Sequence, residues 1–158
     1  MAKEDFLISI FRKEDCRHLI RRELNSLPET ASIRDAIIAL QSQWTGYVCI
    51  LDENKNLIGI ITERDILRCF GENRFNEDDS VKSIMNKSFK TIECRESIAE
   101  IALTLYKTTF MHLAIVDDGK LLGIVSARDF ISYLVEYIAE SVYTVSPSQP
   151  PQDKREGA

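Results

Sequence analysis

Apolar residues along this 158-residue chain fall into short runs and helical stripes, separated by polar segments. Two runs, residues 47–51 and 57–61, have the length and apolarity of buried strands, and the polar residues 52–56 between them predict a turn. Before the first run, Ser32 precedes apolar residues spaced three and four apart, which predicts a capped helix. After the second run we expect another helix, which extends through Phe70, with Gly71 as the stop signal.

The same order of elements returns about 65 positions later. Ser32 is matched by Ser97, and Tyr47, at the start of the first strand, is matched by His112, both at an offset of 65. In the following strand the offset becomes 64, so the missing residue falls in the turn, where a deletion is tolerated best. A register that holds through strands and helices and changes only in a loop indicates a structural repeat.

Polar stretches and helical spacing predict the boundaries of the chain's parts. The spacing of apolar residues between positions 6 and 11 is helical, and this face is covered either by the chain's own core or by a second subunit. Residues 71–80 are polar and acidic, and the chain beyond Val145 is polar and rich in proline. The predicted parts are an N-terminal helix over 1–20, a first unit over 21–70, a linker over 71–80, a second unit over 81–141, opened by residues 81–85, and a disordered tail over 142–158.

Both copies of the second strand end in one motif, which reads Gly, two β-branched residues, a hydroxyl residue, any residue, Arg and Asp. The hydroxyl residues Thr62 and Ser126 are good helix N-caps, and Asp65 and Asp129 lie in the first helical turn, facing the positive end of the helix dipole. A hydroxyl, a carboxylate and free backbone N–H groups at such a terminus also suit a ribose-phosphate. A single copy favours plain capping, whereas two copies in register make a ligand site a serious alternative.

Composition excludes several classes of function. The formal net charge of −5 argues against a general nucleic-acid binder, which has a basic footprint. No apolar run is long enough to span a bilayer, and with four dispersed cysteines and two histidines a zinc site has little support. The sequence offers no nucleophile–base pair and no phosphate-cradling glycine-rich loop, so we do not expect an enzyme. A cytoplasmic protein fits these features.

Each unit therefore reads extended segment, helix, strand, turn, strand and helix, and ends in the Gly-apolar-apolar-Ser/Thr-x-x-Asp motif. This order resembles a tandem pair of CBS domains, a Bateman module, over about residues 21–140. The resemblance implies an α/β (α+β) fold of two units, each a small, mostly three-stranded sheet with two helices, related by a pseudo-twofold axis. Sheets this short are rarely stable alone, so the two units should pack together with their helices outside.

The resemblance also implies a site at each motif. The family's ribose-binding Asp corresponds to Asp65 and Asp129, its phosphate- or ribose-contacting residue to Thr62 and Ser126, and the adjacent arginines would reach phosphates. Extended segments would form the edge that holds the base, and the strand starts would line its pocket. The residues expected to bind ligand are Thr62, Arg64, Asp65, Ser26, Leu27, Tyr47 and Val48 in the first unit, and Ser126, Arg128, Asp129, Thr91, Ile92, His112 and Leu113 in the second.

Two features depart from the family pattern. Many members carry proline where this chain has Cys49 and Ala114, which changes rigidity more than chemistry. The first unit carries bulky Trp44 and Tyr47, which either stack on adenine or fill the cleft, so the second site is the stronger expectation. His112 is interpreted as pocket wall, because no partner for catalysis lies near it in the sequence.

The function implied is regulatory, energy-sensing ligand binding. The ligand would be an adenosine-containing molecule, AMP, ADP, ATP or S-adenosylmethionine, held in clefts between paired units, and no other cofactor is required. Binding would change the geometry of the pair and signal to a separate effector protein. Flat helical faces and the apolar N-terminal helix favour a homodimer. The alternative is a structural dimerisation or interaction module whose clefts bind nothing.

Overall fold

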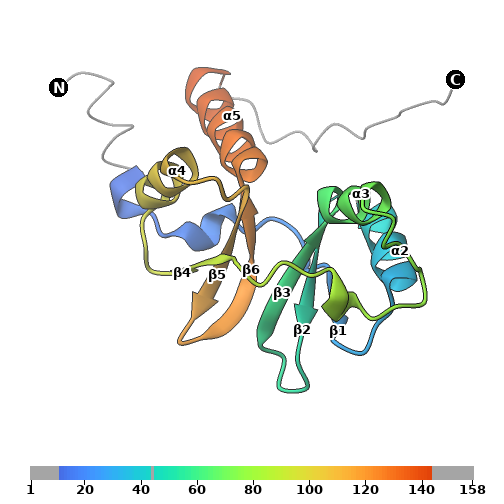
Figure 1. The fold of residues 1–158 in the computed structure, drawn as a ribbon. Coiled ribbons are helices and arrows are strands. Elements are labelled where there is room, and N and C mark those ends of the chain that lie inside the picture. The colour runs from blue at the N-terminus through green and yellow to red at the C-terminus, as the bar shows by residue number, and fades with distance from the viewer. Residues whose placement is uncertain (1–10, 44, 144–158) are drawn as a thin grey trace, which may run out of the picture.

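The structure, a computed structural model, describes residues 11–43 and 45–143, with side chains described as far as residue 139. It contains two three-stranded sheets of identical order, β1-β2-β3 and β4-β5-β6 (Figure 1). In each sheet the first pair of strands is parallel and the second antiparallel. The predicted α+β class, with two small three-stranded units, is confirmed.

The elements follow the predicted order in both units. The first unit holds β1 (Ser26–Pro28), α2 (Ile33–Gln43), β2 (Tyr47–Leu51), β3 (Leu57–Thr62) and α3 (Glu63–Gly71). The second holds β4 (Lys90–Glu93), α4 (Ile98–Lys107), β5 (His112–Asp117), β6 (Lys120–Ser126) and α5 (Ala127–Tyr143). Two short 3-10 helices, η1 (Cys16–Leu19) and η2 (Val81–Ser83), precede the units.

The central strands β2 and β5 contain uninterrupted apolar runs, residues 47–51 and 113–116, because both of their faces are buried. In β2, Val48 and Ile50 pack into the core beneath the first unit's helices. The alternate residues Tyr47 and Cys49 pack instead against β5 and β6 of the other unit. Successive strand side chains point to opposite faces, so one uninterrupted run supplies both cores.

The second unit repeats this arrangement. Leu113 and Ile115 of β5 enter the core beneath α4 and α5, whereas Ala114 faces the first unit's sheet together with Ile124 of β6. The expectation that the two sheets pack against each other, with the helices outside, therefore matches the distribution of buried side chains. All four cysteines are buried free thiols, and Cys49 lies between the sheets, as its apolar surroundings predict.

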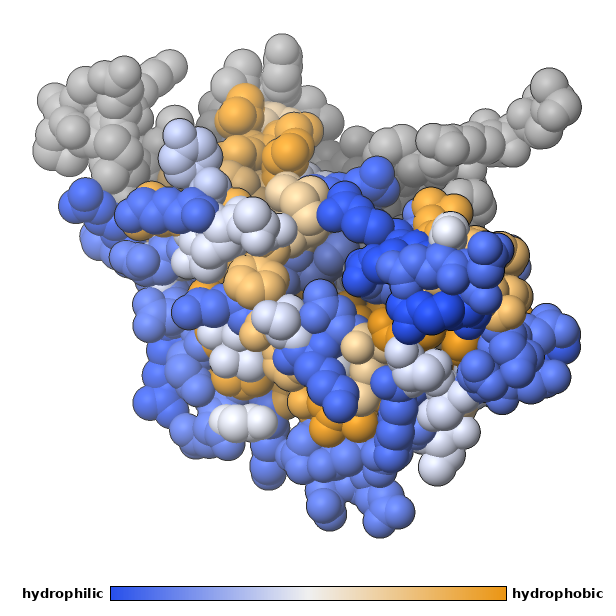
Figure 2. Space-filling view, in the orientation of Figure 1, coloured by the Kyte–Doolittle hydropathy of each residue, from blue (hydrophilic) through white to orange (hydrophobic). Residues whose placement is uncertain are grey.

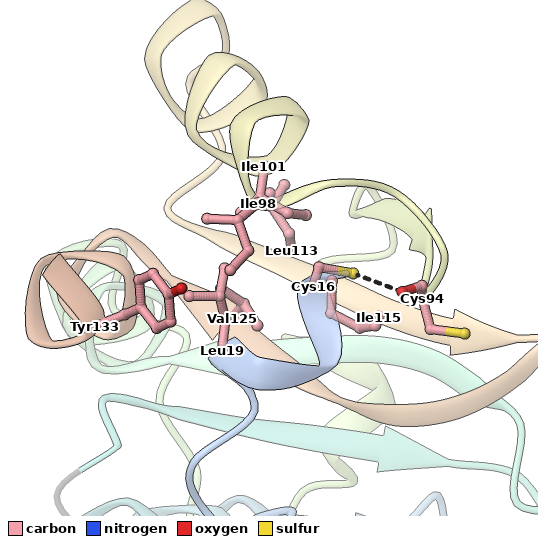
Figure 3. Close-up of a cluster of buried hydrophobic side chains, with 9 residues drawn as sticks. All are labelled: Cys16, Leu19, Cys94, Ile98, Ile101, Leu113, Ile115, Val125 and Tyr133. Atoms are coloured by element: carbon pink, nitrogen blue, oxygen red, sulfur yellow. Dashed lines mark hydrogen bonds between the residues drawn. The ribbon is translucent and has the colours of Figure 1, made fainter. Parts of the chain in front are cut away.

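Each unit is completed by a segment that precedes the other unit in the chain. We call these the lead-in segments, residues 15–20 and residues 80–85. Cys16 and Leu19 of the first are fully buried in the core of the second unit (Figure 3). Val81 of the second is fully buried in the core of the first unit, where Ile84 and Met85 also pack.

Backbone contacts fix this exchange. Asp15 pairs with Ser97 at the start of α4, and the Cys16 N–H donates to the carbonyl of Glu96 at 2.9 Å. Ser80 pairs in the same way with Ser32 at the start of α2. Asp15 and Ser80 lie 65 positions apart, the same offset that relates Ser32 to Ser97, so the repeat extends into the lead-in segments.

These contacts correct two of the predicted boundaries. A single helix over 1–20 is wrong in its described part, since η1 starts anew after Asp15 caps it through the backbone N–H of Arg17. Residues 81–85, predicted to open the second unit, pack on the first. Half of the predicted N-terminal helix and most of the predicted disordered tail lie outside the described residues. Phe11, which is described, packs on α5 of the chain's own second unit.

Glycine is needed where each lead-in segment crosses a strand. A Cβ on Gly123 of β6 would lie 2.6 Å from Cγ2 of Ile20, and a Cβ on Gly59 of β3 would lie 2.6 Å from Sδ of Met85. Real Cβ atoms essentially never lie this close to another heavy atom, so a larger residue at either position would force the side chain of Ile20 or Met85 to shift. The glycine of each motif therefore serves the exchange between units.

The exchange predicts that truncating Leu19 destabilises the second unit. Leu19→Ala should lower the free energy of unfolding by about 2–5 kcal/mol, since it leaves a cavity in a fully buried cluster. Urea unfolding measured by circular dichroism checks this. Leu122→Ala is the matched control, because Leu122 is 40% exposed on β6, and its loss should change the free energy of unfolding by less than about 1 kcal/mol. Equal effects of the two substitutions would contradict the packing described.

Candidate functional site

The two sequence motifs have the same local geometry. Oδ2 of Asp65 accepts hydrogen bonds from the backbone N–H of Thr62 at 2.8 Å and from its hydroxyl at 2.7 Å. Oδ2 of Asp129 accepts from the N–H and hydroxyl of Ser126 at 2.8 and 2.6 Å. Each Asp thus fixes the junction between a strand and the first turn of a helix. In each carboxylate this capping uses only one of the two oxygens.

The chain holds a third copy of this arrangement outside the motifs. At the start of α2, Oδ2 of Asp35 accepts from the N–H of Ser32 at 2.9 Å and from its hydroxyl at 2.8 Å. These hydrogen bonds hold the pKa of Asp35 below its ordinary value. Because the same contacts occur at a helix start with no ligand motif, the local geometry by itself indicates only a cap.

A cleft at the first motif distinguishes it from the third copy. The cleft has a volume of about 140 Å³ and is open to solvent on one side, so it is smaller than the roughly 300–1,000 Å³ of pockets that enclose a drug-sized ligand. The junction of β3 and α3 forms one wall, and the chain before β4 and before β5 forms the other. The lining residues are Ile60, Thr62, Arg64, Asp65, Arg68, Asn86, Ser88, Phe89, Thr109, Phe110, Met111 and His112.

Both walls are fixed by the backbone. Asn86 exchanges two backbone hydrogen bonds with Ile60 of β3, of 2.9 and 3.0 Å, which ties the segment before β4 to the first unit. The side chain of Asn86 accepts from the N–H of Ser88 at 2.8 Å, so this segment turns back along the cleft. A molecule in the cleft would therefore contact both units at once.

The charges in the cleft are unequal. Asp65 is 5% exposed, and its second oxygen, Oδ1, accepts from Nη2 of Arg68 at 2.6 Å. Arg64 lies one turn earlier on the same side of α3 and also lines the cleft, with its side chain exposed. Two guanidinium groups and one carboxylate leave the lining one positive charge in excess, an environment that suits an anion.

Tyr47 and His112, the matched residues at the two strand starts, meet between the units. Their rings lie 5.0 Å apart, and each residue pairs with the hydroxyl residue of its own motif, Tyr47 with Thr62 and His112 with Ser126. Burial lowers the pKa of His112, an effect that the nearby charge of Asp129 opposes. Burial also raises the pKa of the Tyr47 hydroxyl, and the charge of Asp129 adds to this shift.

Other predicted residues do not reach the described cleft with their side chains. Val48 and Leu113 are fully buried beneath the helices, which corrects the expectation that they line a base pocket. Leu27 and Ile92 pack against these same cores. Ser26 is half-buried on β1, and Thr91 is exposed on β4.

The second motif presents its groups more openly than the first. Ser126 and Asp129 are half-buried and Arg128 is exposed. None of the described residues donates a hydrogen bond to Oδ1 of Asp129. Tyr47, expected to stand over the first site, is electrostatically coupled to Asp129 of the second motif. Trp44, the other bulky residue considered, lies outside the described residues.

Sequence reasoning missed the residues that close the cleft. Arg68 follows Asp65 by three positions, so helical spacing alone could have found it. Asn86, Phe89 and Met111 come from the other unit, and no local pattern indicates which motif they face. Among residues 11–43 and 45–143, no group of three His, Cys, Asp or Glu side chains is placed to hold a metal ion. The described helices also include none long and apolar enough to cross a membrane.

Comparison with known proteins gives the same picture of two units. The family model described as the CBS domain matches the chain twice, over residues 14–72 and 81–136. A protein of Methanocaldococcus jannaschii, described as uncharacterised, is 27% identical over 132 residues, which make up 84% of this chain and 46% of that protein. Arabinose 5-phosphate isomerase of Francisella tularensis is 33% identical over 116 residues, 71% of this chain and 35% of the isomerase. This chain thus spans less than half the length of either relative.

Among solved structures, a CBS domain protein from Pyrobaculum aerophilum complexed with AMP superimposes with a TM-score of 0.69 and 27% sequence identity. The superposition covers 80% of this chain and 99% of that protein. The match extends over both units, so the tandem arrangement predicted from the repeat is confirmed.

Burial of His112 predicts a pH dependence of stability. The unfolded chain takes up a proton near pH 6.5 and the folded protein only at lower pH, so stability present above pH 6.5 is lost as the pH falls through the lowered pKa. His112→Gln removes this titration and should lose less stability than the parent between about pH 7.5 and about pH 5. Urea unfolding at both pH values measures the difference. His18→Gln, which alters an exposed histidine, should behave like the parent, and identical losses in all three proteins would contradict the prediction.

Proposed function

The chain belongs to the CBS domain family, and from this membership we propose that it is a regulatory module that binds an adenosine-containing nucleotide between its two units. The observation that carries the proposal is the cleft in which Thr62 and Asp65 of the first unit face His112 and Phe89 of the second. A ligand bound there contacts both units, so its binding free energy can favour one relative position of the units over another.

The chemistry of the cleft matches the parts of an adenylate. The carboxylate of Asp65 is an acceptor for ribose hydroxyl groups. Arg64 and the hydroxyl of Thr62 are donors for a phosphate, together with the N-terminus of α3. Ile60, Phe89 and Met111 supply apolar and aromatic surface for the base.

Among the adenosine-containing ligands considered, AMP has the most direct support. The Pyrobaculum aerophilum protein complexed with AMP is 27% identical and covers 80% of this chain. ADP, ATP and S-adenosylmethionine share the adenosine that the cleft would recognise, so they belong in the same titration. A second site at Ser126, Arg128 and Asp129 follows from the repeat, with Tyr47 beside it. We assign the module a regulatory rather than a catalytic role.

Signalling would pass through the helices. Exposed apolar residues recur at matched positions of the two units, Ile38 and Leu103 on α2 and α4, and Leu67 and Ile131 on α3 and α5. Figure 2 shows apolar side chains gathered along α5, where Val135 and Ile138 extend the series. A repeated apolar face suits a second copy of the chain, and a nucleotide that shifts the units would change the surface offered to an effector protein.

The proposed ribose contact predicts that Asp65→Ala and Asp129→Ala weaken adenylate binding. Loss of a charge-assisted hydrogen bond costs on the order of 1.5–3 kcal/mol, roughly a ten- to hundredfold loss of affinity at the altered cleft. Isothermal titration with AMP, ADP, ATP and S-adenosylmethionine, with thermal melts in parallel, measures both affinity and stability.

Asp35→Ala is the matched control for these variants. It removes the same hydrogen bonds at a helix start away from the cleft, so it should lower stability by about 1 kcal/mol and leave binding unchanged. If Asp65→Ala and Asp129→Ala behaved like Asp35→Ala, the motifs would be caps alone. A parent protein that bound none of the four ligands would favour the structural interaction module.

The apolar helical faces predict a homodimer in solution. Sedimentation at micromolar concentration should give about twice the 18.1 kDa mass of the chain. Val135→Glu places a charge on the exposed face of α5, where Val135 is 59% exposed, and should yield monomers without unfolding the protein. Lys55→Glu, in the turn between β2 and β3, should leave the dimer intact. A parent that sediments as a monomer would rule out this face as a self-association surface.

A further inference from the structure

Arg68 forms an ion pair with Asp65, whose carboxylate the ribose of a nucleotide would need. This ion pair is described in the first unit only. Oδ2 of Asp65 is committed to Thr62, which leaves Oδ1 for a ligand. Oδ1 already accepts from Nη2 of Arg68 at 2.6 Å. The Asp65 side chain is 6% exposed and that of Arg68 is 55% exposed, so the carboxylate is fixed while the guanidinium is free to move into the cleft.

The second unit lacks this contact. The motifs are related by an offset of 64 positions, which places Ser132 where the first unit has Arg68. A serine at that position carries no charge. Within the described part of the chain, Oδ1 of Asp129 has no hydrogen-bond donor. The two motifs are therefore alike in capping and different in the state of the remaining carboxylate oxygen.

We propose that Arg68 is a specificity-determining residue that makes the first cleft select phosphorylated adenosine ligands over uncharged or cationic ones. The proposal rests on the proposed function and names the class of ligand for one of its two clefts. The disfavoured ligands are adenosine, which has no phosphate, and S-adenosylmethionine, which carries a sulfonium cation.

The selection follows from an exchange of partners. Because Asp65 is only 5% exposed, a ribose hydroxyl that donates to Oδ1 competes with the guanidinium of Arg68 for access to that oxygen. A displaced guanidinium needs another anion, because an ion pair of a buried carboxylate is then broken. A phosphate supplies this anion and can accept two parallel hydrogen bonds from an arginine. Arg64, on the same side of α3 and lining the same cleft, is a second donor to that phosphate.

Ligands without a phosphate make this exchange unfavourable. Adenosine takes the carboxylate oxygen and offers the guanidinium nothing in return. S-adenosylmethionine has one carboxylate that could pair with an arginine, but its sulfonium and ammonium groups give it a net positive charge, which is repelled by a cleft in which two arginines outnumber one carboxylate. In the second unit Ser132 stands at the position of Arg68, so no arginine at that helix position competes with a ligand for Asp129.

The test measures ligand preference in the first cleft alone. The full chain carrying Asp129→Ala is titrated with AMP, adenosine and S-adenosylmethionine, and so is the same chain with Arg68→Ser added. With Arg68 present, AMP should bind at least roughly tenfold more tightly than adenosine. With Arg68→Ser the affinities for AMP and adenosine should differ by no more than about threefold. AMP then lacks the guanidinium that pairs with its phosphate, and adenosine no longer competes with that guanidinium for Asp65.

Three further variants and thermal melts keep the result interpretable. Arg74→Ser removes an arginine that pairs with Glu72 outside the cleft, and it should leave the preference unchanged. Thermal melts verify that each variant folds, and Arg68→Lys serves as the second variant, which keeps the charge and should keep part of the preference. Ser132→Arg in a chain carrying Asp65→Ala is the reciprocal change, and it should increase the preference of the second cleft for AMP over adenosine.

The outcomes separate this proposal from the function on which it rests. If the chain with Arg68→Ser prefers AMP over adenosine as strongly as the chain with Arg68, Arg68 is not the selective residue, and this inference fails while the proposed function stands. If the parent binds neither AMP nor adenosine, the proposed function fails and this inference fails with it. A loss of preference confined to Arg68→Ser, with Arg74→Ser unaffected, supports the inference.

Discussion

The exchange of lead-in segments is the contact on which the rest of this structure depends. Ile20 lies against Gly123 of the second unit and Met85 against Gly59 of the first, each at a distance that leaves no room for a Cβ on the glycine. The buried cores follow the same pattern, since Leu19 fills the second core and Val81 the first. Neither unit can therefore move far without pulling on the segment that completes the other. In the proposed function, this link would carry the effect of a ligand bound between the units to the whole pair.

The sequence was sufficient to predict what is encoded locally. Uninterrupted apolar runs predicted β2, β3, β5 and β6, because a strand buried on both faces needs no polar residue. Serine caps predicted where α2 and α4 begin, and the constant offset predicted two equivalent units. The strand and helix ends differ from expectation by one or two residues, as at α3, which ends at Gly71 rather than Phe70.

What the sequence did not reveal is which unit each segment contacts. The apolar pattern of residues 80–85 does not indicate whether they pack on the unit that follows them in the chain or on the unit that precedes them. Asn86, Phe89 and Met111 face Asp65 only because the two sheets pack against each other, and this contact belongs to the tertiary structure. Gly59 and Gly123 were visible as part of a motif, but their role became clear only when the neighbours of the missing Cβ were known.

The capping geometry explains how a binding site can coexist with a stable helix start. In Asp65 and Asp129, as in Asp35, one carboxylate oxygen accepts both hydrogen bonds from the cap residue, and the other takes no part in the cap. A ligand that uses the second oxygen leaves the cap intact, so its binding does not have to unravel α3 or α5. Asp35 makes the same cap contacts but does not line the described cleft. In our proposal, a site arises where a cap that occurs at three of the described helix starts meets the other unit, and the residue that contacts the remaining oxygen, Arg68 in the first cleft, sets which ligands bind.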